Sequence, residues 1–110
     1  MPDLANINRW LADQGDDLVA LAEAASLAAR VEPALLRRLR LEVGPNSDAG
    51  LESDLWFSPL VESKNVSGFV FQAEARSLLR ERLAAEPHRL QAAWRIINEA
   101  HASAPPSLHL

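Results

Sequence analysis

Residues 16–30 of the chain read DDLVALAEAASLAAR, and this stretch predicts the central helix of the fold. Leu18, Leu21 and the alanines that follow recur at helical spacing and form a narrow stripe of small apolar side chains. Small side chains let a second helix approach closely, so we expect other helices to pack around this one. Asp16 is expected to cap its start, and Gly15 to end the preceding helix in the left-handed conformation.

Apolar residues at helical spacing predict further helices on both sides of this stretch. They cover residues 3–14, 33–43, 51–57, 72–85 and 88–102. Asp3 and Asp48 are placed to cap two of them, and Pro33 suits a first helical turn because proline has no N–H to leave unpaired. Trp10 and Trp94 fall on the apolar stripes of their helices and are expected in the core.

The middle of the chain carries weaker periodicity. Residues 55–57, Leu-Trp-Phe, fit either the end of the 51–57 helix or a short buried strand, and the cap at Asp48 favours the helix. Residues 58–61 are expected to form one turn and residues 62–68 a polar loop. Residues 69–71, Phe-Val-Phe, are β-prone but few, so we expect an extended segment that leads into the next helix.

The length of 110 residues fits one ordinary domain with a single core. Leu and Ala, both good helix formers, make up about a third of the chain. We therefore predict an all-α fold, a compact bundle of five to six short helices, over residues 1–104. Pro105 and Pro106 forbid continuation of the last helix. Residues 105–110 end on apolar side chains and are expected to lead to a downstream domain.

The composition argues against several kinds of site. The chain has no cysteine, which rules out disulfide bonds, thiolate zinc sites, iron–sulfur clusters and a cysteine nucleophile. His88 and His101 lie about 20 Å apart on one predicted helix and cannot share a metal ion. No Gly-x-Ser-x-Gly elbow and no glycine-rich phosphate loop is present. We therefore expect a protein that is not an enzyme and uses no cofactor, metal or small-molecule substrate.

No membrane-spanning segment or export signal is visible in the sequence. No apolar run approaches the roughly 20 residues that cross a bilayer. The first residues, Met-Pro-Asp, are not followed by the basic and apolar regions of a signal peptide. We therefore expect a cytoplasmic location and no membrane partner.

Charge alternates in sign along the chain. Residues 3–23 carry five acids and one Arg, residues 30–40 four Arg and one Glu, residues 42–62 five acids and no base, and residues 64–95 six bases and three acids. This alternation fits ordinary solvated helix faces, and it also fits a bipolar surface whose two sides attract a partner and set its register. In the second interpretation the partner-binding residues are Arg37, Arg38 and Arg40 on the basic side, with Asp13, Asp16 and Asp17 or Glu52 and Asp54 on the acidic side.

Trp56 and Phe57, close to Pro59, form the densest apolar spot in the sequence. Aromatic side chains of this size usually anchor a core. They are also the side chains that dominate the energetics of protein interfaces. The pair is therefore interpreted first as core and second as a partner-binding hot spot.

Five motifs within residues 35–105 resemble N-terminal helical modules that precede effector domains in bacterial proteins. They are residues 36–41 (LRRLRL), 54–61 (DLWFSPLV), 68–71 (GFVF), 79–84 (LRERLA) and 94–101 (WRIINEAH). The effectors in such proteins are formylglycine-generating-enzyme-like domains, trypsin-like or caspase-like proteases and NTPase switches. The resemblance implies an adaptor module of a bacterial conflict or antiphage system, with a death-like (caspase-recruitment-like) fold.

Three functions are consistent with these observations. The first is a non-catalytic adaptor or recruitment module that pairs with a like helical domain, in a homotypic or heterotypic way. The second is a structural cap that packs on a downstream effector domain of the same chain. The third is a DNA-binding regulator that reads DNA with the arginine-rich helix 33–43, and the net charge of −4 disfavours it.

Overall fold

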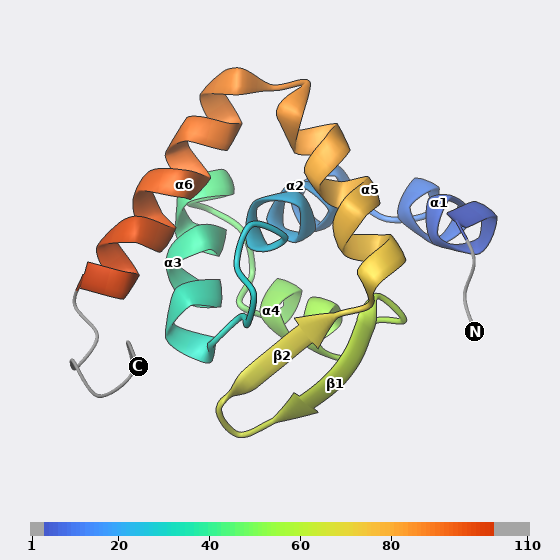
Figure 1. Cartoon of the computed structure of the whole chain (residues 1–110), viewed down its shortest axis with the longest axis horizontal. Helices are drawn as coiled ribbons and strands as arrows, with labels where there is room; N and C mark the ends of the chain where they lie inside the picture. The colour runs from blue at the N-terminus through green and yellow to red at the C-terminus, as the bar shows by residue number, and fades with distance from the viewer. Residues whose placement is uncertain (1–3, 103–110) are drawn as a thin grey trace.

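The computed structural model describes residues 4–102, in which six helices accompany one two-stranded sheet (Figure 1). In chain order the elements are α1 (Leu4–Ala12), α2 (Asp16–Ala25), α3 (Pro33–Val43), α4 (Gly50–Trp56), β1 (Val61–Asn65), β2 (Gly68–Phe71), α5 (Ala73–Ala84) and α6 (Pro87–Ala102). The helical character of the prediction is confirmed, and the two strands are an addition to it. The expected cap at Asp3, the stop at Pro105 and Pro106 and the tail 105–110 lie outside the described residues.

Helix α2 lies at the centre of the molecule, as its small side chains predict. It packs against α3, α4, α5 and α6, which surround it in Figure 1. Leu21, Ala22 and Ala25 on this helix are completely buried. The close approach that small side chains allow therefore organises the whole bundle around one short helix.

Both ends of α2 differ from the prediction. Asp16 is the first residue of the helix and not its cap, and Gly15 occupies the cap position with φ −69°, which is not left-handed. The helix also ends earlier than residue 30: its last residue is Ala25, and Ser26 is the C-cap. There the Ser26 hydroxyl donates to the Glu23 carbonyl (2.6 Å), and Arg80 Nε donates to the Ser26 carbonyl (2.7 Å). These side chains bond the backbone groups at the helix end, so the chain can turn away at that point.

Strands β1 and β2 form an antiparallel hairpin where a polar loop was expected over residues 62–68. Asn65 pairs with Gly68, and the two residues between them make a tight turn in which Asn65 Oδ1 accepts the Ser67 N–H (2.8 Å). The expectation was wrong because β1, with the sequence VESKN, is largely exposed and shows no apolar alternation. Its strand structure comes from pairing with the buried strand β2.

The hairpin is tied to the segment that follows α2 through a single residue. Val31 N donates to the Phe69 carbonyl (2.8 Å), and Phe69 N donates to the Val31 carbonyl (3.0 Å). Gly68, with φ +151°, makes this approach possible, because a Cβ at that position would lie 2.6 Å from the Val31 carbonyl oxygen. The glycine therefore serves close backbone contact as well as the turn.

The segment expected as a helix over residues 51–57 is helical, as the sequence favoured, and α4 covers Gly50–Trp56, with Phe57 just after its last residue and Ala49, not Asp48, at its N-cap position. Asp48 Oδ1 accepts the N–H of Gly50, the first residue of this helix, at 2.7 Å. Leu55 points into the core and is completely buried. The strand alternative for residues 55–57 is thereby excluded.

Trp94 is not in the core as expected, because 54% of it is exposed. The buried side of α6 is centred on Ala93, Ile96 and Ile97. At about 100° per residue, Trp94 falls just beyond the edge of that side. Trp10 is half-buried and packs against the core, in line with the prediction. Within residues 4–102 no helix has both the length and the apolar character that crossing a membrane requires.

Candidate protein-interaction surface

The three arginines predicted to form a basic patch on α3 point in three directions. Arg38 Nη2 contacts Glu99 Oε2 of α6 at 2.6 Å. Arg40 is 8% exposed and turns toward α4. Arg37 is exposed and, alone of the three, has no ion-pair or hydrogen-bond partner among the described residues. Successive helix positions are about 100° apart, so neighbouring arginines on one helix diverge, and the predicted patch is reduced to Arg37.

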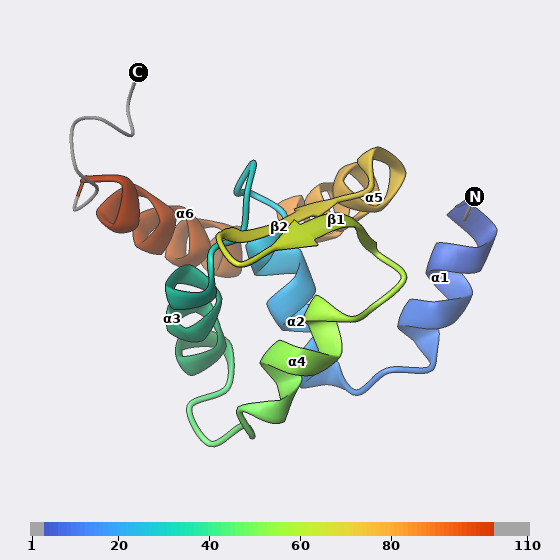
Figure 2. The same cartoon turned by 90° about the horizontal axis from the view of Figure 1, so that it is seen from below.

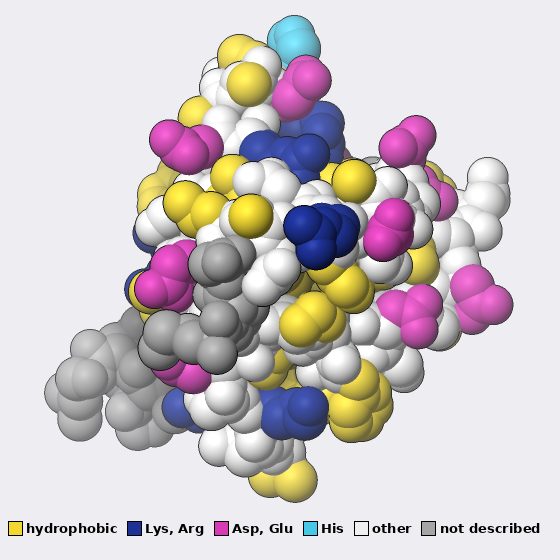
Figure 3. All heavy atoms as spheres, turned by 90° about the vertical axis from the view of Figure 1, so that its right-hand side faces the viewer, with side chains coloured by type: hydrophobic (Ala, Val, Ile, Leu, Met, Phe, Trp, Pro, Cys, Tyr) yellow, Lys and Arg dark blue, Asp and Glu magenta, His cyan; other side chains and the backbone are white. Residues whose placement is uncertain are grey.

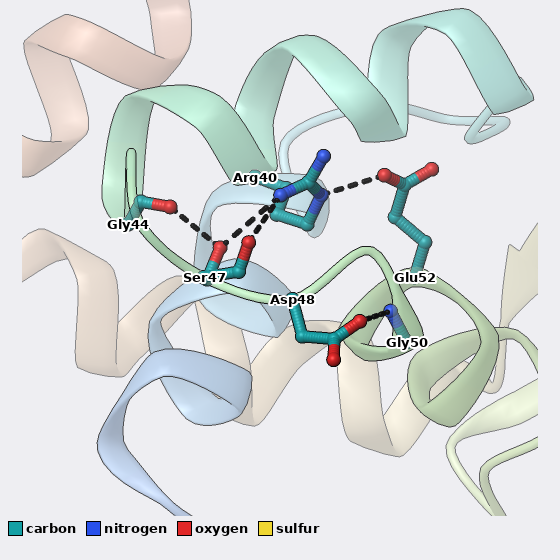
Figure 4. Close-up of polar contacts among 6 residues, drawn as sticks. All are labelled: Arg40, Gly44, Ser47, Asp48, Gly50 and Glu52. Atoms are coloured by element: carbon teal, nitrogen blue, oxygen red, sulfur yellow. Dashed lines mark hydrogen bonds and ion pairs between the residues drawn. The ribbon is translucent and has the colours of Figure 1, made fainter.

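Arg40 and Glu52, expected on opposite sides of an interface, form an ion pair with each other (Figure 4). Arg40 Nε lies 2.6 Å from Glu52 Oε2, and Arg40 Nη1 donates to the Ser47 carbonyl at 2.7 Å. The Ser47 hydroxyl in turn donates to the Gly44 carbonyl (2.5 Å) at the end of α3. The pair fastens the 44–50 loop and α4 onto α3, which leaves little of either charge for a partner.

A groove runs between the start of α3 and one side of α4. Its volume is about 300 Å³, and its lining is mostly apolar. The lining residues are Pro33, Leu36, Glu52, Ser53, Trp56 and Phe57. Because Glu52 is neutralised by Arg40, the groove has no unpaired acidic side chain in its wall. We call this feature the aromatic groove.

Trp56 and Phe57 have different surroundings: Trp56 packs against the core, as the first interpretation expects, whereas Phe57 is exposed. Trp56 is half-buried and meets Phe69 of the hairpin edge-to-face, with ring centroids 5.4 Å apart. Phe57 is 70% exposed, and Lys64 Nζ of β1 lies 4.8 Å from the centre of its ring. An aromatic side chain with this much exposure is the kind of anchor that partner proteins cover.

On the other side of α4 the predicted acidic residues come together. A wide hollow of about 530 Å³ is lined by Gln14, Gly15, Asp16, Asp17, Leu18, Leu51 and Asp54. It joins Asp16 and Asp17 from the first predicted acidic group with Asp54 from the second, and none of the three has an ion-pair partner in the described part of the chain. Asp13 is exposed just after α1 but is not part of the lining. We call this feature the acidic hollow.

The views of the whole molecule show the neighbours of α4 and the charged side chains on the face where α1 lies. Figure 2 shows α4 between α3 on one side and the connection from α1 to α2 on the other. In Figure 3 the largest group of acidic side chains gathers at the right-hand edge, while several basic side chains lie nearer the middle of that face. Charges of opposite sign therefore occupy neighbouring regions of the surface.

A second charged cluster was not predicted from the sequence. Glu23 of α2 is 5% exposed, and its carboxylate lies 2.7 Å from Arg89 of α6 and 3.8 Å from Arg82 of α5. A hollow of about 330 Å³ lies beside these three side chains. The only sequence signal was an acid within the alanine stripe of α2. A buried carboxylate needs a charged partner, which here ties three helices together.

The described residues do not form a metal site. No group of three or more His, Asp or Glu side chains within residues 4–102 is arranged so that it could hold a metal ion. All three acids of the acidic hollow are exposed, which is the environment of a solvated or partner-facing carboxylate.

Comparison of the chain with models of protein families, with curated proteins and with solved structures gives no match.

Proposed function

We propose that this domain is a non-catalytic protein–protein interaction module that pairs with a like domain. In this proposal it serves as an adaptor with a death-fold-like arrangement of helices, placed ahead of an effector domain in a cytoplasmic bacterial defence or signalling protein. The resemblance of the five sequence motifs supports the adaptor role. The surface around α4 supports pairing.

The observation that carries the proposal is the exposed ring of Phe57 between two oppositely charged regions. The ring lies at the aromatic groove with Lys64 above it, and the exposed Arg37 lies on α3 one helical turn after Pro33, which lines the groove. The acidic hollow lies across α4. An apolar anchor supplies affinity once water is excluded from it, and complementary charges at its edge guide approach and set register. The apolar anchor and the charges that a pairing surface requires are both present on α4 and its neighbours.

The test is light scattering coupled to size exclusion, at several protein concentrations and two salt concentrations. We expect species larger than the monomer that grow with concentration and dissociate at higher salt, because salt screens exposed charges. Reversal of the basic charge in R37E/R38E should abolish pairing and leave the far-ultraviolet circular dichroism unchanged.

The matched control is R9E, which makes the same charge change at an exposed arginine of α1 that has no ion-pair partner among the described residues. R9E should pair like the unaltered protein. A protein that stays monomeric under every condition would contradict pairing with a like domain and would favour the structural cap. Pairing that survives R37E/R38E would show that the basic side was wrongly assigned.

A further inference from the structure

Helix α4 separates the aromatic groove from the acidic hollow. Leu51 and Asp54 line the hollow, whereas Glu52 and Trp56 line the groove. At about 100° per residue these two pairs lie on opposite sides of the helix, and Leu55 faces the core between them. Ser53 and Phe57, four residues apart, are exposed and form the outer border of the groove. We call these last two residues, Ser53 and Phe57, the α4 ridge.

The two sides of the α4 ridge carry opposite charge. Arg37 is exposed and lies one helical turn after Pro33, a lining residue of the aromatic groove, so the two residues share one side of α3. Lys64 adds a second positive charge there through its contact with Phe57. The acidic hollow on the other side carries three aspartates without ion-pair partners among the described residues. Figure 2 shows α4 between α3, which carries Arg37, and the connection from α1 to α2, which borders the hollow.

This side-by-side arrangement selects one symmetry for pairing with a second copy. Two copies face to face can be related by a two-fold axis lying between them, in the plane of contact. If the axis runs along α4, the basic side of each copy meets the acidic side of the other. If it runs across α4, like charges meet, which opposes association. A two-fold contact uses the same patch on both copies, so the assembly stops at the dimer.

Resting on the proposed function, we propose that a second copy of this chain docks on the α4 ridge about a two-fold axis that runs along α4. Arg37 of each copy then faces the acidic hollow of the other, so that the charge contact is made twice. The α4 ridges face each other, and each Phe57 ring is covered close to the axis. The occupant of this surface is thus the same surface on another molecule.

A residue near a two-fold axis approaches its own counterpart, whereas in a head-to-tail assembly no residue does so. The chain has no cysteine, so a single introduced cysteine reports this directly. We expect S53C, on the α4 ridge, to be joined into covalent dimers by a short bis-maleimide at low salt. The control S77C, at an exposed position on α5, should stay monomeric under the same treatment.

The charge contact is tested by charge reversal at two neighbouring arginines, Arg37 and Arg38, whose side chains point to different sides of α3. R37E should raise the dissociation constant of the dimer about 100-fold, about tenfold for each of two symmetric contacts. R38E makes the same charge change on the α6 side of α3, where Arg38 already pairs with Glu99, and should leave the dissociation constant within about threefold of its original value. D54K, in the acidic hollow, should weaken pairing as R37E does.

The outcomes separate this inference from the proposed function. Two-fold docking on α4 is supported if pairing is sensitive to salt and stops at the dimer. It also requires that S53C is cross-linked while S77C is not, and that R37E weakens pairing while R38E does not. Pairing that grows beyond two, that leaves S53C monomeric, or that responds equally to both arginines overturns the two-fold docking and leaves the interaction module standing. A monomer at all concentrations overturns both.

Discussion

Arg40 and Arg38 lie two residues apart on α3 and form ion pairs of the same length, 2.6 Å, in different surroundings. The Arg40–Glu52 side chains are 10% and 17% exposed, whereas the Arg38–Glu99 side chains are 42% and 51% exposed. Solvent screens the second pair and stabilises its partners when they separate. The first pair has little access to that compensation, so loss of one partner leaves a charge inside the protein.

We therefore predict that E52A lowers the free energy of unfolding by about 3 kcal/mol. R38A, which breaks the exposed pair, should lower it by less than about 1 kcal/mol. Both values can be measured by urea denaturation of the purified protein at low concentration. The double variant R40M/E52L, which replaces the pair with apolar side chains, should recover most of the loss. Equal effects of E52A and R38A would show that burial does not govern the strength of these pairs.

The sequence could indicate that residues 37–40 carry positive charge, but it could not assign each arginine a partner. Helical spacing turns Arg38 away from Arg37 and Arg40, which are three residues apart and lie on neighbouring positions of α3. Which of them becomes buried depends on Glu52, which α4 brings to α3 after a loop, and on Glu99, some sixty positions along the chain. Contacts of this kind are tertiary, so no pattern within α3 reveals them.

At the scale of secondary structure, elements with strong local signals were predictable. Pro33 at the first turn and an apolar stripe place α3 at Pro33–Val43, the range expected from the sequence. The strand β1 has no such signal, because its structure depends on pairing with β2. Likewise, α2 ends early because Arg80 of α5 bonds its terminal region. The elements that were missed or shortened are those whose hydrogen-bond partners lie elsewhere in the chain.

The hairpin gives a prediction about a single glycine. In G68A the new Cβ would lie 2.6 Å from the Val31 carbonyl oxygen, at a φ of +151° that L side chains rarely adopt. We expect a loss of about 2 kcal/mol or more in the free energy of unfolding. The control G15A meets no atom within 4 Å and should lose less than about 1 kcal/mol. A G68A protein as stable as G15A, measured by thermal denaturation, would contradict the close approach.

At the scale of the whole molecule, pairing and folding are linked. A second copy that binds the folded chain and not the unfolded chain raises stability by mass action. We therefore predict that the Tm of the unaltered protein rises as its concentration is increased at low salt. R37E should show this rise only at about 100-fold higher concentrations, because its pairing is weaker by that factor. Scanning calorimetry over a wide concentration range tests this, and identical Tm values for the two proteins at every concentration would count against the link.

The gathering of Asp16, Asp17 and Asp54 also belongs to this scale. The alternation of charge along the sequence predicted acidic partner-binding residues, but it gave two separate acidic groups as alternatives. The fold merges parts of both because α4 packs against α2. Asp13 is left outside the hollow and Glu52 is turned inward, so no count of charges along the chain could select the members of the final set.

The central place of α2 has a consequence for how the chain emerges during synthesis. Residues 16–25 leave the ribosome early, yet the helices that bury them are completed only as residues 33–43, 50–56, 73–84 and 87–102 follow. Until the last of these arrives, the alanine-rich side of α2 lacks part of its cover, and Glu23 lacks the arginine of α6 that lies closest to its carboxylate. We therefore expect the core of this domain to close only after translation has passed α6.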